Sequence, residues 1–452
     1  MAITQVDPSI FKAYDVRAIH PTQIDGEVAR RVGRAFVDYL KAKTIAVGRD
    51  VRLSSPEIAS GFIAGARSEG CDVVDIGVAG TDMMYFHVAS RGLDGGAIIT
   101  ASHNPKEYNG IKMVRRGAYA LSGDAGIKEI KEAVMAGRFS DEGTGRGGLR
   151  AETISDDYAE HCLSFAERGV IRRGRAVLDP GNGMGAVGAA AVFARLPLET
   201  VRMYFDLDGT FPNHPPDPLV EENRREIAER VRAEKADLGI AWDGDADRCF
   251  FIDDTGEFVP GDFVTALLGE AFCGKEKGAK IVYDVRASRA VKDRVEAAGG
   301  TALMHRVGHA FIKKRMRDEN AVFGGEVSGH FYFRDNWFAD NGMIPAVVVL
   351  EMLGRSGRRF SELLAPLRER YHISGEINSR VSDVEGALRR LEEKYRDGRV
   401  LKLDGLSVDY DDWHFNVRPS NTEPLLRLNL EAYARADMER RRDEVLEIIR
   451  KA

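Results

Sequence analysis

The chain has 452 residues, of which 44% are hydrophobic and 30% charged, and its formal net charge is −6. This length predicts about three domains with sizeable cores. The mildly acidic balance excludes a protein that binds nucleic acid through a global basic field, and the longest apolar run near the C-terminal half, Ile344–Leu353, is too short to span a membrane.

The chain begins with a polar segment, Met1–Lys12, that has no signal-peptide pattern. Its four cysteines, Cys71, Cys162, Cys249 and Cys273, form neither a CxxC motif nor a zinc-type spacing. We therefore expect reduced thiols and a cytoplasmic location.

Short apolar runs alternate with helical patterns along most of the chain. The predicted strands include Thr44–Val47, Gly95–Thr100, Arg175–Leu178, Leu238–Trp242, Lys280–Tyr283 and Ala321–Gly324. The predicted helices include Asp25–Ala42, Ser55–Gly70 and Gly261–Phe272. This alternation predicts α/β layers with mostly parallel sheets.

One arrangement recurs three times: an apolar strand, a compact polar loop and a second strand. The three loops are Ser102–Pro105, Asp243–Arg248 and Glu326–His330. The recurrence predicts three related mixed α/β domains, each offering one loop to a central cleft, because rigid strands commonly carry functional loops. Residues 372–452 predict a C-terminal α+β domain with a charged final helix.

The second loop alternates Asp243, Asp245 and Asp247 with small residues, which lets a tight turn direct three carboxylates at one point. Mg²⁺ prefers such oxygen ligands, and the following Arg248 could hold a phosphate beside it. An EF-hand opens with the same spacing, but Arg248 stands where that motif needs glycine and Asp254 stands where it needs glutamate.

The first loop begins with Ser102, followed by His103, Asn104 and Pro105 in a turn that the proline favours. A serine in a turn is most often a hydrogen-bonding cap. The adjacent histidine, nearby Lys112 and a three-carboxylate loop elsewhere instead favour a nucleophile that a metal activates. No Gly-x-Ser-x-Gly elbow surrounds Ser102.

Residues Gly183–Gly188 match the dinucleotide pattern G-x-G-x-x-G, and Asp206 follows at about the expected distance. Residues 179–182 make the approach to these glycines longer than the tight turn of that fingerprint. The glycines could equally serve helix–strand packing. An enzyme that uses a nicotinamide cofactor stays an alternative.

Four motifs together resemble those of the α-D-phosphohexomutase superfamily, and within it the phosphomannomutase/phosphoglucomutase branch. They are Thr100–Pro105 (TASHNP), Asp243–Arg248 (DGDADR), Gly325–His330 (GEVSGH) and Arg418–Pro424 (RPSNTEP), and the opening Phe11–Arg17 (FKAYDVR) is similar as well. The resemblance covers nearly the whole chain in the family's order. It implies four domains around a cleft: a phosphoserine-loop domain (1–147), a metal-binding domain (148–254), a sugar-binding domain (255–370) and a phosphate-clamp domain (371–452).

The resemblance also implies roles for individual residues. The catalytic set would be phosphorylated Ser102, His103, Lys112, Arg17 and His330, and the Mg²⁺ ligands would be Ser102, Asp243, Asp245 and Asp247. The substrate contacts would be Tyr14, Arg248, Arg286, His309, Glu326 and Ser328, with Arg418, Ser420, Asn421 and Thr422 holding the phosphate that does not react.

The implied activity interconverts hexose 1-phosphate and hexose 6-phosphate through a hexose 1,6-bisphosphate, with a sugar phosphate as the partner molecule. Asn421 is similar to the mannose/glucose branch, because glycine is usual there in the glucosamine branch. Arg286 stands where some members have lysine, and Val327 stands where methionine is common, so fine sugar preference is open. A phosphoglucosamine mutase and a metal-dependent phosphatase remain alternatives, and the sequence leaves the oligomeric state open.

Overall fold

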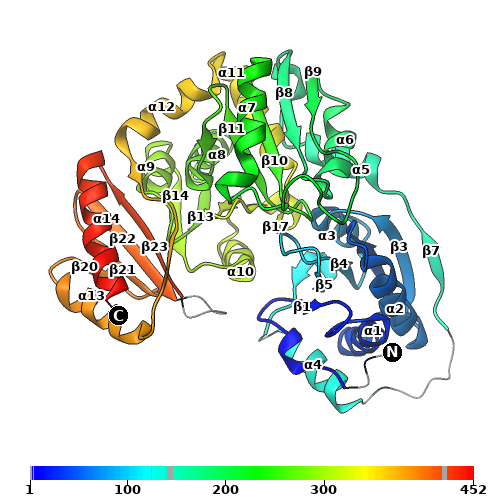
Figure 1. Cartoon of the computed structure of the whole chain (residues 1–452). Coiled ribbons are helices and arrows are strands. Elements are labelled where there is room, and N and C mark those ends of the chain that lie inside the picture. The colour runs from blue at the N-terminus through cyan, green and yellow to red at the C-terminus, as the bar shows by residue number, and fades with distance from the viewer. Residues whose placement is uncertain are drawn as a thin grey trace. The chain divides into compact units, whose positions relative to one another are not determined.

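The structure is a computed structural model of the chain and describes residues 3, 5–123, 125–137, 139, 146–419 and 425–451. Figure 1 shows the helices and strands of the chain. They belong to two compact units. The first unit comprises Met1–Val259 and Ser328–Phe360, and the second comprises Pro260–Val327 and Ser361–Ala452.

The first unit begins with a seven-stranded mixed sheet of order β1-β5-β4-β2-β3-β7, with β6 paired to β5. Its strands are β1 (Val16–Ile19), β2 (Thr44–Arg49), β3 (Asp72–Val78), β4 (Gly95–Ile99), β5 (Tyr108–Arg115), β6 (Tyr119–Ala120) and β7 (Leu149–Ala151). Its helices are η1 (Pro8–Ile10), α1 (Gly26–Leu40), α2 (Ser55–Ser68), α3 (Thr81–Ser90), η2 (Arg116–Ala118) and α4 (Ile127–Ala136).

A second sheet in this unit has the order β12-β11-β10-β8-β9. Its strands are β8 (Gly174–Asp179), β9 (Leu198–Arg202), β10 (Leu238–Trp242), β11 (Cys249–Asp253) and β12 (Phe258–Val259). The helices of this region are α5 (Ser155–Leu163), η3 (Arg168–Val170), α6 (Gly185–Phe193), η4 (Glu221–Arg224) and α7 (Arg225–Glu234). The unit ends with β16 (Phe331–Phe333), η5 (Arg334–Asn336), the antiparallel partner β17 (Ala339–Asp340) and α11 (Ile344–Ser356).

The second unit holds two groups of elements. The first contains α8 (Gly261–Lys275), β13 (Lys280–Asp284), α9 (Arg289–Ala297), β14 (Thr301–His305), α10 (His309–Glu319) and β15 (Phe323–Gly325), with β13 parallel to both β14 and β15. Helix α12 (Phe360–Arg370) leads to the second group, an antiparallel sheet of order β18-β23-β22-β21-β20 with β19 paired to β23. Its strands and helices are β18 (His372–Ile373), β19 (Ile377–Arg380), α13 (Val384–Lys394), β20 (Arg399–Leu401), β21 (Leu406–Asp409), β22 (Trp413–Pro419), β23 (Leu425–Ala432) and α14 (Arg435–Arg450).

These elements confirm the predicted fold class, including the six strands and three helices expected above. The sheets are more mixed than the alternation suggested, because β5 runs antiparallel to both β1 and β4 in the first sheet. The C-terminal sheet is antiparallel in every pair described.

Central strands fix the loops that carry the candidate site. Every residue of β4, β10 and β11 is buried, as expected for strands covered on both faces. Strand β4 ends three residues before Ser102, and β10 ends directly before Asp243. Both loops therefore start from backbone that packing holds firmly.

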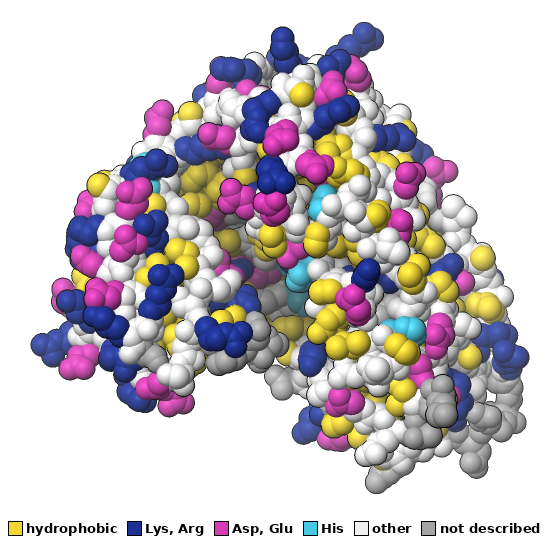
Figure 2. Space-filling model, in the orientation of Figure 1, with side chains coloured by type: hydrophobic (Ala, Val, Ile, Leu, Met, Phe, Trp, Pro, Cys, Tyr) yellow, Lys and Arg dark blue, Asp and Glu magenta, His cyan; other side chains and the backbone are white. Residues whose placement is uncertain are grey.

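The exterior matches the balanced composition. Figure 2 shows basic and acidic side chains interspersed over the face it draws. In the described residues no helix has both the length and the apolar character needed to cross a bilayer.

Candidate active site

Ser102 lies buried between two polar loops of the first unit, with 1% of its surface exposed. Its Oγ donates to Asp243 Oδ2 at 2.7 Å and lies 3.2 Å from His103 Nδ1. Its φ of 51° lies in the left-handed region, which non-glycine residues enter only at a cost. Such local strain is typical of functional sites, and it directs this hydroxyl at the carboxylate loop.

The serine and carboxylate loops pack backbone against backbone. A Cβ added at Gly244 would lie 2.4 Å from the carbonyl oxygen of Ser102, so only glycine allows this approach. A Cβ at Gly183 would lie 2.7 Å from the oxygen of Gly244, and Met184 N–H donates to that same oxygen at 3.0 Å. Gly183, the first glycine of the pattern that resembles a dinucleotide fingerprint, therefore packs against the carboxylate loop, and the other two glycines of the pattern pack against side chains of the fold.

Three buried carboxylates converge in this loop. Asp243, Asp245 and Asp247 each offer an oxygen, and these oxygens all lie within 4.8 Å of one another. Lys112 Nζ donates to Asp245 Oδ2 and Asp247 Oδ2, at 2.6 Å each. Asp245 Oδ1 is buried without a hydrogen-bond partner in the described chain. An all-oxygen set with a free buried carboxylate oxygen suits a hard divalent cation, so the residues present fit a metal.

The environment shifts the pKa values of Asp243 and Asp247 in opposite directions. Burial, together with the neighbouring Asp247 and Asp245, raises the pKa of Asp243 well above its usual value. Burial also disfavours the charged form of Asp247, but Lys112 and His330 outweigh it and hold its pKa well below the usual value. Burial, then Arg248 and Arg17, lowers the pKa of His103 well below its usual value, so this imidazole is neutral.

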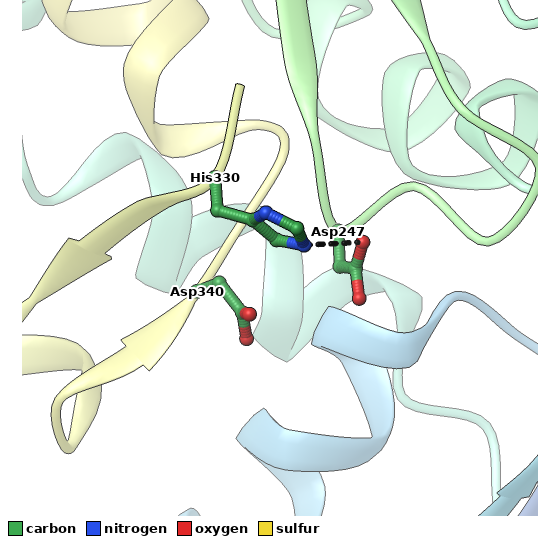
Figure 3. Close-up of side chains that lie close together, drawn as sticks. All are labelled: Asp247, His330 and Asp340. Carbon is green, nitrogen blue, oxygen red and sulfur yellow. Dashed lines mark ion pairs between the residues drawn. The ribbon is translucent and has the colours of Figure 1, made fainter. Parts of the chain in front are cut away.

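Figure 3 shows His330 close to Asp247 and Asp340, and its ring also contacts Arg248. Its Nε2 is 3.5 Å from Asp247 Oδ1 and accepts from Arg248 Nε at 3.3 Å. Its Nδ1 is 2.9 Å from Ser328 Oγ. Arg248 Nε can only donate, so Nε2 is the acceptor in that contact, while Ser328 holds the other ring nitrogen.

Arg17 ties the opening motif to the serine loop. It donates to Asp15 Oδ2 at 2.7 Å, to the carbonyl oxygen of Ala101 at 3.0 Å, and to Asn104 Oδ1. Tyr14, from the same motif, is partly buried. The sequence-predicted residues Ser102, His103, Lys112, Arg17, Arg248 and His330 therefore form one connected group with the three aspartates.

Two further residues of this group were missed from the sequence. Buried Arg52 donates to the carbonyl oxygens of Ser102, Asn104, Pro105 and Tyr108 at 2.6–3.0 Å, so its guanidinium organises the whole serine loop. No motif marked Arg52, because the four carbonyl oxygens to which it donates lie about fifty residues away along the chain.

Thr81 is the second missed residue. Its Oγ1 donates to Asp245 Oδ2 at 2.5 Å, and its N–H donates to the Asp245 carbonyl oxygen at 2.9 Å. Thr81 begins α3, so that helix holds both the backbone and the side chain of the carboxylate loop. The contact joins residues 164 positions apart, and the sequence alone offers no indication of it.

The second unit gathers arginines around one carboxylate. Glu376 Oε2 lies 3.1 Å from Arg286 and 3.6 Å from Arg418, while Glu376 Oε1 lies 3.3 Å from Arg427. Asp284 fixes Arg286 through two further hydrogen bonds of 3.0 and 2.9 Å. Burial and then Arg286 lower the pKa of Arg418, and its Nε has no hydrogen-bond partner among the described residues. This surplus of buried cationic groups suits a phosphate.

Other predicted substrate contacts also lie in this unit. Glu326 is buried, and its Oε1 accepts from the N–H of Gly308 at 2.9 Å. That bond fixes the start of α10, where His309 is the first residue. Ser420, Asn421 and Thr422 lie outside the described residues.

Comparisons with known proteins agree with this arrangement. Family models described as phosphoglucomutase/phosphomannomutase match throughout: α/β/α domain I at residues 8–141, α/β/α domain II at 156–256, α/β/α domain III at 260–371 and the C-terminal domain at 376–448. A phosphomannomutase of Salmonella montevideo is 42% identical over 97% of this chain and 98% of its own length. A protein of Xanthomonas campestris pv. campestris named phosphohexose mutases is 41% identical over 97% of this chain and 99% of its own.

A solved structure is similar as well. The X-ray structure of a phosphoglucomutase/phosphomannomutase family protein from Burkholderia thailandensis has a TM-score of 0.89 and 34% identity to this chain. The match covers 98% of this chain and 97% of that one.

Proposed function

The chain belongs to the phosphoglucomutase/phosphomannomutase family, and we propose that it interconverts hexose 1-phosphate and hexose 6-phosphate through a phosphorylated Ser102. The observation that carries this proposal is the 2.7 Å contact between Ser102 Oγ and a cluster of three buried carboxylates. A serine that only capped a turn would need no such surroundings.

Charge balance explains why this serine needs a divalent cation. In the first unit, three carboxylates face Lys112 and Arg248, with Arg17 close enough to Asp245 to interact electrostatically. A phosphoryl group on Ser102 would add about two negative charges. Asp243, Asp245 and Asp247 would hold Mg²⁺ there, and when bound it would polarise the phosphoryl group and offset its charge.

The side chains around Ser102 stabilise charge and move protons during the transfer. Arg248 and Lys112 stabilise negative charge on the phosphoryl oxygens during transfer. His330 takes up the proton of the attacking sugar hydroxyl, because its Nε2 lies beside the carboxylate cluster and Ser328 orients the ring. Neutral His103, 3.2 Å from Ser102 Oγ, orients the serine oxygen while the phosphoryl group leaves it.

The phosphate that does not react is held by the arginine cluster of the second unit. Arg418 would bind it together with Ser420, Asn421 and Thr422, and Arg286 adds positive charge beside it. The intermediate, a hexose 1,6-bisphosphate, must turn round between the two transfers, so this cluster must accept either phosphate. The four domain boundaries predicted from the sequence form part of the proposal.

Sugar choice follows from the half-turn of the bisphosphate. Only groups that reach equivalent places after the turn keep their partners, and on a pyranose ring these are the hydroxyls at C3 and C4. We assign Glu326 and Ser328 to them, with Tyr14 and His309 as further sugar contacts. The C2 position then lacks a dedicated partner, so mannose and glucose phosphates should both react, with kcat/KM values within roughly 10–200-fold of each other.

Steady-state kinetics with mannose, glucose, glucosamine and galactose 1-phosphates test this function. Galactose 1-phosphate should be much poorer, because inversion at C4 leaves a buried polar group unpaired. A strong preference for the glucosamine sugar would favour a phosphoglucosamine mutase. Release of inorganic phosphate in place of the 6-phosphate would favour the phosphatase alternative.

A further inference from the structure

A cavity of about 470 Å³ lies at the end of the second sheet opposite the carboxylate loop. Gly174 and Leu238, the first residues of β8 and β10, line it, and these two strands run parallel. The carboxylate loop follows the other end of β10, about 15 Å away at the usual rise of a strand. The cavity lies entirely within the first unit and is distinct from the active site.

Positive charge dominates the rim of this cavity. Its basic residues are Arg172, Arg173, Arg232, Lys235, Arg358 and Arg359, against the two carboxylates Asp237 and Asp254. One carboxylate is engaged, because Asp254 lies 3.6 Å from Arg359. Such a cluster stands out in a chain whose net charge is −6.

Three of these cations are available to a ligand. Arg172, Arg173 and Lys235 are exposed, and none of them forms an ion pair within the described part of the chain. Lys235 caps the C-terminal end of α7, where a cation also offsets the partial negative charge of the helix. Arg172 and Arg173 precede β8 and cap no helix, so helix ends do not account for them.

The wall of the cavity is apolar. Leu198 and Leu353 are partly exposed to it, and buried Leu350 and Phe360 lie behind. A single inorganic phosphate would leave this wall in contact with water. The volume falls within the range of about 300–1,000 Å³ that small-molecule sites have.

We propose that this cavity binds a nucleoside diphosphate, with its diphosphate held by Arg172, Arg173 and Lys235 and its nucleoside against the apolar wall. Charged side chains of this type hold phosphate groups by charge-assisted hydrogen bonds, and the diphosphate supplies the multiple negative charges that the rim can pair. The nucleoside covers the leucines, which inorganic anions cannot do.

Hydrogen exchange and titration calorimetry on the full chain test this site, with uridine 5′-diphosphate and inorganic pyrophosphate as probes. The nucleotide should slow exchange in peptides covering 171–174 and 353–360, and it should bind more tightly than pyrophosphate. The double variant Arg172→Gln, Lys235→Gln should bind the nucleotide about tenfold or more weakly than the unchanged protein does.

A matched control is Arg225→Gln, Arg230→Gln, which removes two exposed arginines of α7 outside the cavity. It should leave nucleotide affinity unchanged. Three results would overturn the proposal. The first is an equal loss of nucleotide affinity in both double variants, and the second is slowed hydrogen exchange only in peptides around Ser102 and Arg248. The third is equal affinity for nucleotide and pyrophosphate.

Discussion

At the scale of single residues, Ser102 combines strain with support. Its left-handed backbone costs about 1–2 kcal/mol in a non-glycine residue, and the fold has to supply that energy. Thr100 Oγ1 accepts the Ser102 N–H at 2.9 Å, and Arg52 donates to the Ser102 carbonyl at 2.7 Å. The hydroxyl is thereby oriented before any ligand arrives.

Thr81 makes the first prediction at this scale. Replacing it with valine keeps the shape but removes the hydroxyl that orients Asp245, so Oδ1 of that carboxylate loses its fixed direction. Supporting hydrogen bonds of this kind typically contribute roughly 10–100-fold to metal affinity. Thr81→Val should therefore weaken Mn²⁺ binding by about that factor, measured by calorimetry, and raise the Mg²⁺ concentration needed for turnover.

The matched variant Thr81→Ser retains the hydroxyl and should bind Mn²⁺ almost as the unchanged protein does. If Thr81→Val also binds Mn²⁺ with unchanged affinity, Thr81 serves only to start α3.

Sequence and structure agree unevenly at this scale. The aspartates, Ser102 and His330 were predictable because each lies in a compact motif between apolar strands. Thr81, Arg52 and Glu376 were not, because their roles depend on contacts 164, 50 and 90 positions away along the chain. Such partners become neighbours only when the sheets assemble.

At the scale of elements, the loop after β4 depends on one buried arginine. Lysine at position 52 could pair with Asp50 but could not donate to four carbonyl oxygens, since it lacks the planar fork. Arg52→Lys should lower the free energy of unfolding by roughly 2–4 kcal/mol, because buried carbonyls lose charged donors. It should also reduce kcat in the protein that stays folded.

Arg34→Lys provides the comparison, because Arg34 is likewise buried and pairs with Glu69 away from the serine loop. It should destabilise the chain without lowering kcat. Equal loss of kcat in both variants would show that Arg52 has no special role in the loop.

A buried acid on β23 predicts a pH dependence of stability in the second unit. Burial raises the pKa of Glu431 to about 8, and nearby Asp262 adds to the effect. The carboxyl group meets the start of α9, where Oε1 accepts the Arg289 N–H at 3.2 Å. Because the folded state binds this proton more tightly, stability falls as pH rises from about 4.3 toward 8, by at most about 1.4 kcal/mol per pH unit.

Glu431→Gln removes that proton equilibrium. Denaturant unfolding at pH 5 and pH 8 measures the free energy of unfolding of both proteins. Relative to the unchanged protein, the variant should become more stable by about 1 kcal/mol or more between these two pH values. Glu385→Gln, at an exposed glutamate of α13, should show no such gain. A difference that stays constant with pH would mean that Glu431 is charged in the folded state.

The order of the elements was more predictable than their pairing. Short apolar runs between helical patterns marked strands β2, β4, β8, β10, β13 and β15, whose residues are largely buried. Strand β7 gave no such pattern, because all three of its residues are exposed at a sheet edge. The antiparallel pairing of β5 with β1 and β4 depends on packing between segments that local sequence cannot rank.

At the scale of the whole molecule, each compact unit contains one part of the proposed chemistry. The first holds the serine, the carboxylates and the proton acceptor, and the second holds the arginine cluster. The proposed reaction uses both parts. The family models match residues in both units, in keeping with this division.

The central claim is that Ser102 carries the transferred phosphoryl group, and mapping that group tests it most directly. The protein is incubated with glucose 1,6-bisphosphate and Mg²⁺, digested, and analysed by peptide mass spectrometry. We expect one added phosphoryl group, located on Ser102, and neither phosphorylation nor mutase turnover in Ser102→Ala. A phosphoryl group on any other residue, or full turnover by Ser102→Ala, would contradict the account.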